Sequence, residues 1–132
     1  MTASMSALSR LRPFARLCPH ALAGLLWLAA ALPAQAQFVG GIDDLPLMPG
    51  LAAVPGADLV FETPAGRIVE AMAVMPEEMT ADAVRDFYDR TLPQLGWQVA
   101  AAGQYRREGE VLSLEFTAGP PPAVRFRLAP AR

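Results

Sequence analysis

The sequence predicts an α+β fold, in which one amphipathic helix packs on a curled antiparallel sheet of about four to six strands, preceded by a Pro/Gly-rich arm. Three observations predict it. Residues 84–95 place apolar side chains at helical spacing, and residues 111–128 contain two runs in which apolar and polar side chains alternate. Residues 38–57 contain Gly and Pro too often for a helix or a central strand.

The arm, residues 37–57, combines turn signals with apolar side chains. Its two Pro-Gly pairs, Pro49-Gly50 and Pro55-Gly56, are typical of type II turns. The arm holds too many large apolar residues for a disordered linker, namely Leu45, Leu47, Met48, Leu51 and Val54. We therefore expect it to pack across its own domain. Alternatively, residues 45–49 form an extended peptide that is presented to a partner.

A β-hairpin is expected next. Leu59-Val60-Phe61 is a short apolar strand, residues 63–66 are a four-residue turn, and residues 67–74 form the second strand. Pro76 ends the hairpin.

The helix begins after Thr80, a residue type suited to capping a helix N-terminus. Its apolar stripe consists of Val84, Phe87, Tyr88, Thr91, Leu92 and Leu95. On the opposite face we expect two weak ion pairs at a spacing of four, Arg85–Asp89 and Asp86–Arg90. Pro93 is expected to tighten the last turn, and Gly96 to end the helix.

Four more strands are expected, over residues 97–101, 104–107, 111–117 and 124–128. Alternation in the last two predicts a sheet with one buried face and one wet face, with the helix covering the buried one. In-register pairing places Glu115 opposite Arg125 or Arg127 on the wet face.

The first 36 residues have the order of a secretory signal peptide. Three Arg (Arg10, Arg12 and Arg16) precede a twelve-residue apolar run, residues 21–32, and the small-residue triplet Ala34-Gln35-Ala36 follows. We expect cleavage after Ala36, which makes Gln37 the new N-terminus. The apolar run spans about 18 Å as a helix, too short for a permanent membrane anchor. An uncleaved N-terminal helix is the alternative. The expected organisation is therefore signal peptide (1–36), arm (37–57) and a single α+β domain (58–132), in a periplasmic or secreted protein.

Composition excludes several chemistries. Residues 37–132 contain no His, Cys or Lys, and their eight Arg and 13 acidic residues give a net charge of −5. Ser-His hydrolases, thiol enzymes, Schiff-base enzymes and P-loop NTPases need residues that are absent there, as do zinc sites made from Cys or His. We expect no cofactor and no metal, and the negative charge disfavours nucleic acid as a partner.

Several strings resemble a family of short exported bacterial proteins of unknown function. They are residues 87–97 (FYDRTLPQLGW), 45–50 (LPLMPG), 66–71 (GRIVEA) and 106–110 (RREGE). The FYxxTLPQLGW-type helix end is the most recognisable part. The resemblance implies export and a small α+β domain, and it brings no catalytic or ligand residues.

Four charged residues are candidates for binding. Glu70, between Ile68 and Met72, would be the centre of a carboxylate-based hydrolase if it faced inward beside a second carboxylate. The alternative interpretation, which we favour, is a charge on an edge strand that discourages aggregation. Arg106, with Arg107, and Arg125 and Arg127 form either a small basic patch or part of a mixed solvated surface.

The sequence therefore favours a protein that is not an enzyme, a non-catalytic interaction or accessory domain of the cell envelope. Such a domain would use its polar sheet face, an exposed edge strand or the proline-rich arm. Its expected partner is an envelope protein. The first alternative is a binder of a small apolar ligand, with a pocket between arm, helix and sheet. The second is the hydrolase centred on Glu70.

Overall fold

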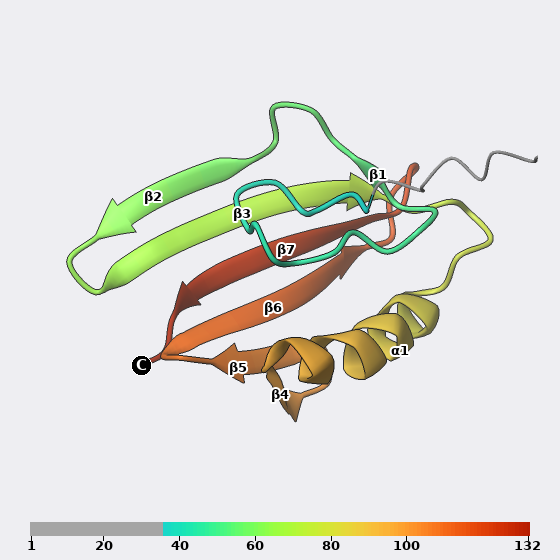
Figure 1. Cartoon of the computed structure of the whole chain (residues 1–132). Helices are drawn as coiled ribbons and strands as arrows, with labels where there is room; N and C mark the ends of the chain where they lie inside the picture. The colour runs from blue at the N-terminus through green and yellow to red at the C-terminus, as the bar shows by residue number, and fades with distance from the viewer. Residues whose placement is uncertain (1–35) are drawn as a thin grey trace, which may run out of the picture. The chain divides into compact units, whose positions relative to one another are not determined.

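The computed structural model describes residues 36–132, so residues 1–35 of the expected signal peptide lie outside the described residues. Seven antiparallel strands form one sheet (Figure 1): β1 (Ala52–Ala53), β2 (Leu59–Thr63), β3 (Gly66–Val74), β4 (Gln98–Ala101), β5 (Gln104–Arg107), β6 (Glu110–Thr117) and β7 (Ala123–Pro130). The strand order is β1-β3-β7-β6-β5-β4, and β2 also pairs with β3. The hairpin and the four later strands confirm the prediction, except that the hairpin loop has two residues, Pro64 and Ala65, because Thr63 pairs with Gly66.

Two details of the predicted sheet, its four to six strands and its curl, were wrong. The seventh strand, β1, comes from the arm, and the sheet is open and not strongly curled (Figure 1). An α-helix is about 10–12 Å wide and strands lie about 4.8 Å apart, so one helix covers only two or three strands. Here the arm lies over the remainder of the same face, above β3 and β7, and the sheet has no need to curl around the helix.

The helix forms where the apolar stripe predicts it. Helix α1 (Ala81–Thr91) is capped by Thr80, whose Oγ1 accepts a hydrogen bond from the Ala83 N–H at 3.1 Å. It continues into a 3₁₀ turn, Leu92–Leu95, at Pro93, and ends at Gly96, whose φ of 86° is left-handed. These features confirm the cap, the tightened last turn and the stop. Only Leu95 departs from the stripe, because it is 39% exposed.

The expected ion pairs on the outer face of α1 do not form among residues 36–132. Arg85 instead pairs with Asp82, three residues earlier, at 2.7 Å. Its guanidinium also lies over the Phe116 ring, 4.7 Å from the centroid. Asp89 accepts a hydrogen bond from the hydroxyl of Tyr105 at 2.7 Å. The contacts with Phe116 and Tyr105 are tertiary, and they take the place of local pairs that stabilise a helix by only about 0.2–0.5 kcal/mol each.

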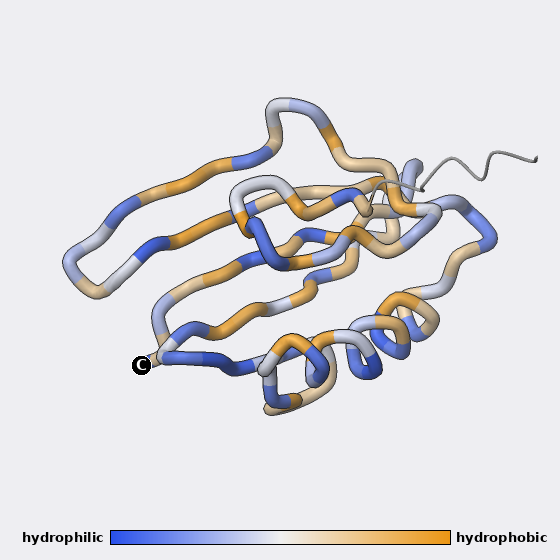
Figure 2. Tube along the Cα trace, viewed as in Figure 1, coloured by the Kyte–Doolittle hydropathy of each residue, from blue (hydrophilic) through white to orange (hydrophobic). Residues whose placement is uncertain are grey.

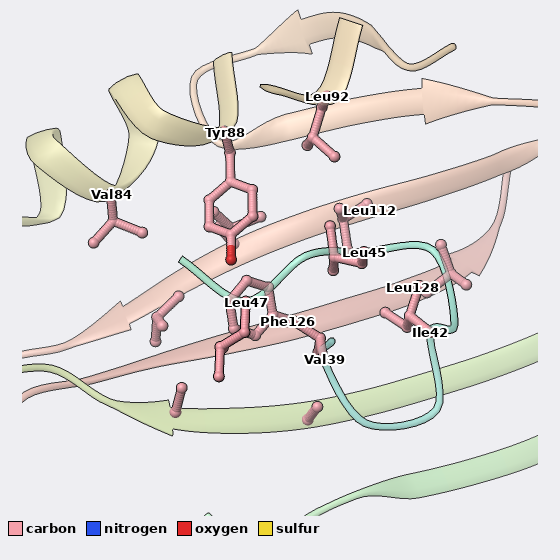
Figure 3. Packing of buried hydrophobic residues seen from close by; sticks show 14 of the residues in the cluster. Val39, Ile42, Leu45, Leu47, Val84, Tyr88, Leu92, Leu112, Phe126 and Leu128 are labelled. Carbon is pink, nitrogen blue, oxygen red and sulfur yellow. The ribbon is translucent and has the colours of Figure 1, made fainter. Parts of the chain in front are cut away.

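The core lies between the inner face of the sheet and a layer made of α1 and the arm. Figure 3 shows side chains of the arm, the helix and the sheet meeting there. Five arm residues are buried: Val39, Ile42, Leu45, Leu47 and Leu51. They pack in one cluster with Val84, Tyr88 and Leu92 of the helical segment and with the alternating residues of β3, β6 and β7. The arm is therefore part of the core.

Tyr88 connects the helix to the arm. Its hydroxyl donates to the carbonyl oxygen of Pro46 at 3.0 Å and accepts from the Met48 N–H at 3.1 Å. Its ring makes an edge-to-face contact with Phe126 of β7, with centroids 5.5 Å apart. Burial raises the pKa of Tyr88 to about 12, against a small opposing effect of the hydrogen bond from Met48.

An alkaline titration should detect this burial. The sequence contains two Tyr and no Lys, and burial also raises the pKa of Tyr105. Because both folded-state pKa values lie above the unfolded value near 10, the phenols contribute their full stabilisation below pH 10, and it is lost as pH rises through about 12. We expect phenolate absorbance at 295 nm to appear well above pH 10 in the folded protein and near pH 10 in urea. Ionisation near pH 10 with a native circular dichroism spectrum would contradict the buried positions.

Candidate interaction site

Strand β2 exposes three consecutive apolar side chains. Leu59, Val60 and Phe61 are 48%, 54% and 54% exposed. Figure 2 shows them as an apolar stretch of the outermost strand of the β2–β3 hairpin. Isolated exposed apolar residues are ordinary, whereas three consecutive ones on one strand mark a candidate interaction site, and we call these three side chains the β2 patch.

The patch occupies both faces of the strand. Val60 lies opposite the buried Val69 and so faces the covered side of the sheet, while Leu59 and Phe61 face the other side. The arm reaches Val60, since a Cβ added at Gly41 would lie 3.1 Å from Val60 Cγ2, yet it leaves half of Val60 exposed. Consecutive apolar residues are typical of strands covered on both faces. In β2 neither face is fully covered.

The backbone of β2 is also open on one side. β2 pairs with β3 alone, from Leu59 opposite Glu70 to Thr63 opposite Gly66. Half of the N–H and C=O groups of such an edge strand point away from its neighbour. The rest of that edge of β3 is closed by β1 and by the Val54 N–H, which donates to the Met72 carbonyl oxygen at 2.9 Å. On this side of the sheet, β1 is only two residues long and β2 is five residues long, so β2 provides most of the open edge.

The opposite edge of the sheet is less suited to pairing. It is formed by β4, which has four residues and an irregular register between Val99 and Ala101. Such irregularities twist an edge away from further strands. β4 also follows Trp97, which is 2% exposed, so the strand is held against the core at its start.

Two exposed acidic residues flank the apolar run. The Asp58 carboxylate fills the space beside Gly40, where a Cβ would lie 2.0 Å from its Oδ2. Glu62 lies opposite Arg67, but Arg67 instead binds Glu110 at 3.0 Å, and this hydrogen bond raises the pKa of Arg67. Neither Asp58 nor Glu62 belongs to an ion pair among the residues that the structure describes.

Both interpretations of the position of Glu70 need correction. Glu70 lies on β3, which has β2 and β1 on one side and β7 on the other, so it is not on an edge strand. Its neighbours Val69 and Ala71 face the core, so Glu70 faces outward. There Arg127 binds its carboxylate at 3.3 Å. An acid–base role stays a prediction, which hydrolysis by a Glu70→Gln variant would test.

The arginines do not gather into a basic patch. Arg106 and Arg107 are neighbours on β5 and so face opposite sides, with Arg106 exposed and Arg107 half-buried. Arg127 is paired with Glu70, and Arg125 with Glu115 at 3.6 Å, as its predicted register requires. The exposed face of the sheet therefore carries acidic and basic side chains together. This agrees with the expected mixed solvated surface and not with the expected basic patch.

Arg107 joins three parts of the fold. Its guanidinium lies over the Trp97 ring, 4.4 Å from the centroid, and donates to the Leu95 carbonyl oxygen at 3.0 Å. It also pairs with Asp44 of the arm at 2.5 Å. Arg107 therefore links the arm to the end of the helical segment. A polar groove of about 630 Å³ beside it is lined by residues that include Asp44, Arg106, Glu108 and Glu110.

A ligand pocket was expected between arm, helix and sheet. The structure has an apolar groove of about 370 Å³ between the arm and α1, lined by residues that include Pro46, Met48 and Phe87, while the space deeper inside, toward the sheet, is filled by the core. Tyr88 and Leu45 are both fully buried there. An apolar groove of about 540 Å³ lies elsewhere, between the loop before α1 and the loop between β6 and β7. It is lined by residues that include Met75, Met79, Phe116, Pro120 and Pro122.

Within residues 36–132, no three His, Cys, Asp or Glu side chains are grouped as a metal site requires. No helix in this part of the chain is long and apolar enough to cross a membrane. Comparisons of the chain with protein-family models, with curated proteins and with solved structures find no match. The candidate site therefore depends on the geometry of β2.

The sequence predicted β2 as part of a hairpin, and an exposed edge strand as one possible interaction surface, but it did not identify β2 as that edge strand. One signal was present in the sequence. Residues 59–61 are apolar without alternation, a pattern that predicts cover on both faces. The sequence does not reveal that this strand forms the edge of the sheet, because the strand order results from long-range pairing.

Proposed function

We propose that this protein is a non-catalytic interaction domain that binds an extended segment of a partner along β2. One observation carries the proposal: an edge strand with an open backbone exposes about half of each of Leu59, Val60 and Phe61. Natural proteins usually protect such edges with charges, Pro or covering segments, because unprotected edges pair with other chains. An added strand would cover both the backbone and the apolar side chains.

The expected affinity is modest. Burying the exposed half of three such side chains stabilises a complex by about 2–4 kcal/mol. Each backbone hydrogen bond adds about 0.5–1.5 kcal/mol, and ordering the partner segment opposes both contributions. These free energies favour a weak, reversible complex between β2 and the partner segment.

Site-specific cross-linking tests the proposal. With a photo-cross-linking amino acid in place of Phe61, we expect a cross-linked product in cells that make the protein. The matched position is Val99, which is 50% exposed on the irregular edge strand β4, and we expect no such product there. A second substitution, Leu59→Lys, should remove the product at position 61. Equal products from both positions would contradict a specific role of β2.

We also propose that the domain acts outside the cytoplasm, because the order of basic, apolar and small residues in 1–36 is typical of exported proteins. Cleavage after Ala36 would keep the contacts of the arm, since the first of them is the Gln37 carbonyl oxygen, which accepts from the Leu47 N–H at 2.7 Å. The intact mass of protein from a periplasmic extract should correspond to residues 37–132. A mass that includes residues 1–36 would contradict cleavage.

The second candidate function is binding of a small apolar ligand. The groove of about 540 Å³ favours it, because its flexible Met side chains, from Met75 and Met79, adapt to varied apolar shapes. A fatty acid that binds there should raise the melting temperature in a saturable way, and Met79→Glu should remove the effect. If the variant responds as the original protein does, the groove is not the binding site.

A further inference from the structure

We infer that the segment bound by β2 carries three consecutive apolar residues flanked on each side by a basic residue. This inference rests on the proposed function and specifies the chemistry of the partner. The partner is another protein that presents such a segment in extended form. Because the pattern is symmetric, it fits β2 in either strand direction.

The positions of Asp58 and Glu62 carry the inference. Side chains alternate along a strand, so Val60 and Glu62 of β2 extend to one face of the sheet, while Leu59 and Phe61 extend to the other. Asp58 directly precedes the strand. An added strand places one residue directly opposite each of positions 59–62, and one further residue of that strand reaches Asp58. The residues that reach Asp58 and Glu62 therefore meet a carboxylate, and the three between them meet apolar side chains.

The Glu62 carboxylate is available for this contact, and Asp58, whose carboxylate lies beside Gly40 of the arm, is accessible from solvent. Asp58 and Glu62 are exposed, and the Arg closest in register to Glu62, Arg67, is held by Glu110 at 3.0 Å. Residues 37–132 carry a net charge of −5, which attracts a basic partner over longer distances as well. Opposite charges directly across a strand pair stabilise it, and like charges destabilise it.

The same charges disfavour a second copy of this chain as the occupant. The two-fold antiparallel register that buries the most apolar surface sets Val60 against Val60 of the other copy and Leu59 against its Phe61. In that register Glu62 of each copy faces Asp58 of the other, so two pairs of carboxylates repel each other. Shifting the pair by one step, to set Phe61 against Phe61, places Glu62 opposite Val60. Neither register of two copies gives an apolar run with complementary charges.

Capped nine-residue peptides test the inference. Each has three central β-branched apolar residues, flanked on each side by Lys, by Gln or by Glu. We would titrate each into the ¹⁵N-labelled protein and follow the amide signals of residues 58–63. The Lys peptide should bind at β2 about 3- to 10-fold more tightly than the Gln peptide at low salt, and the Glu peptide least tightly. Salt should reduce the difference.

Two variants with the same change in net charge separate local from general electrostatics. Glu62→Lys should abolish the preference for the Lys peptide. Glu78→Lys, in the loop after the other end of β3, should preserve most of it. Equal loss in both variants would show a general charge effect and overturn the inference.

The remaining outcomes distinguish this inference from the proposed function. Equal binding of the Lys and Gln peptides at residues 58–63 would overturn the charge pattern, while strand addition at β2 would stand. No shift at β2 with any peptide at millimolar concentration would overturn both. Sedimentation analysis that shows a dimer lost on Leu59→Lys substitution would make a second copy the occupant, and it would overturn the inference of a basic partner.

Discussion

Deleting residues 37–51 is expected to abolish cooperative folding of the domain. The segment contributes five buried side chains, Val39, Ile42, Leu45, Leu47 and Leu51. At about 1.5–3 kcal/mol each, their burial stabilises the fold by at most about 7–15 kcal/mol. Small domains have a total stability of about 5–15 kcal/mol, so the loss equals most or all of it. Thermal unfolding followed by circular dichroism and calorimetry measures the effect.

A pair of leucine variants tests, without deleting residues 37–51, whether the arm stabilises the fold. Leu45→Ala, in the arm, should lower the free energy of unfolding by about 2–5 kcal/mol, because Leu45 is fully buried. Leu95→Ala, at the end of the helical segment, should cost much less, because Leu95 is 39% exposed. Similar small losses for both would mean that the arm does not form part of the core.

The second large effect is expected at Tyr88. Tyr88→Phe should lower the free energy of unfolding by about 1–3 kcal/mol, measured by urea denaturation. The ring remains, but the Pro46 carbonyl oxygen and the Met48 N–H lose the hydroxyl that each of them contacts. Phe cannot replace either hydrogen bond, and both groups lie in a partly buried environment.

Tyr105→Phe is the matched control. Tyr105 is fully buried as well, but its hydroxyl donates to the carboxylate of Asp89, an exposed residue that water can solvate after the change. We expect the loss from Tyr105→Phe to be smaller than that from Tyr88→Phe. The reverse order would contradict the role of the Tyr88 hydroxyl in holding the arm.

Elements that depend on local patterns were predictable. The helix, its cap at Thr80 and its stop at Gly96 follow from neighbouring residues, and the structure contains each of them. The alternation in β6 and β7 also set the predicted pairing of Glu115, which faces Arg125. Short-range periodicity and turn chemistry are enough for such elements, because the interactions that decide them lie within a few residues.

Predictions that required knowledge of strand order failed. Glu70 was assigned either to an interior site or to an edge, and it lies outward on a strand with neighbours on both sides. Of the helix-surface ion pairs, Arg85–Asp89 is absent because Asp89 accepts from the distant Tyr105 hydroxyl and Arg85 lies over the Phe116 ring and pairs with Asp82. Asp86–Arg90 is absent because Arg90 donates to the Asp86 carbonyl oxygen instead of its carboxylate. For Glu70 and Asp89, a contact from a distant part of the chain replaces the one that the local pattern indicates.

For this protein, the amino-acid sequence alone predicts an α+β domain, excludes His-, Cys- and Lys-based chemistry from residues 37–132, and indicates an apolar run at residues 59–61. The tertiary structure alone decides that the arm belongs to the core and that the apolar run is at an open edge. The physical reason is that burial and edge position result from long-range packing and strand order. The hydropathy of a strand indicates whether its side chains favour burial. The strand order and the packing of distant segments determine whether other residues of the same chain bury them.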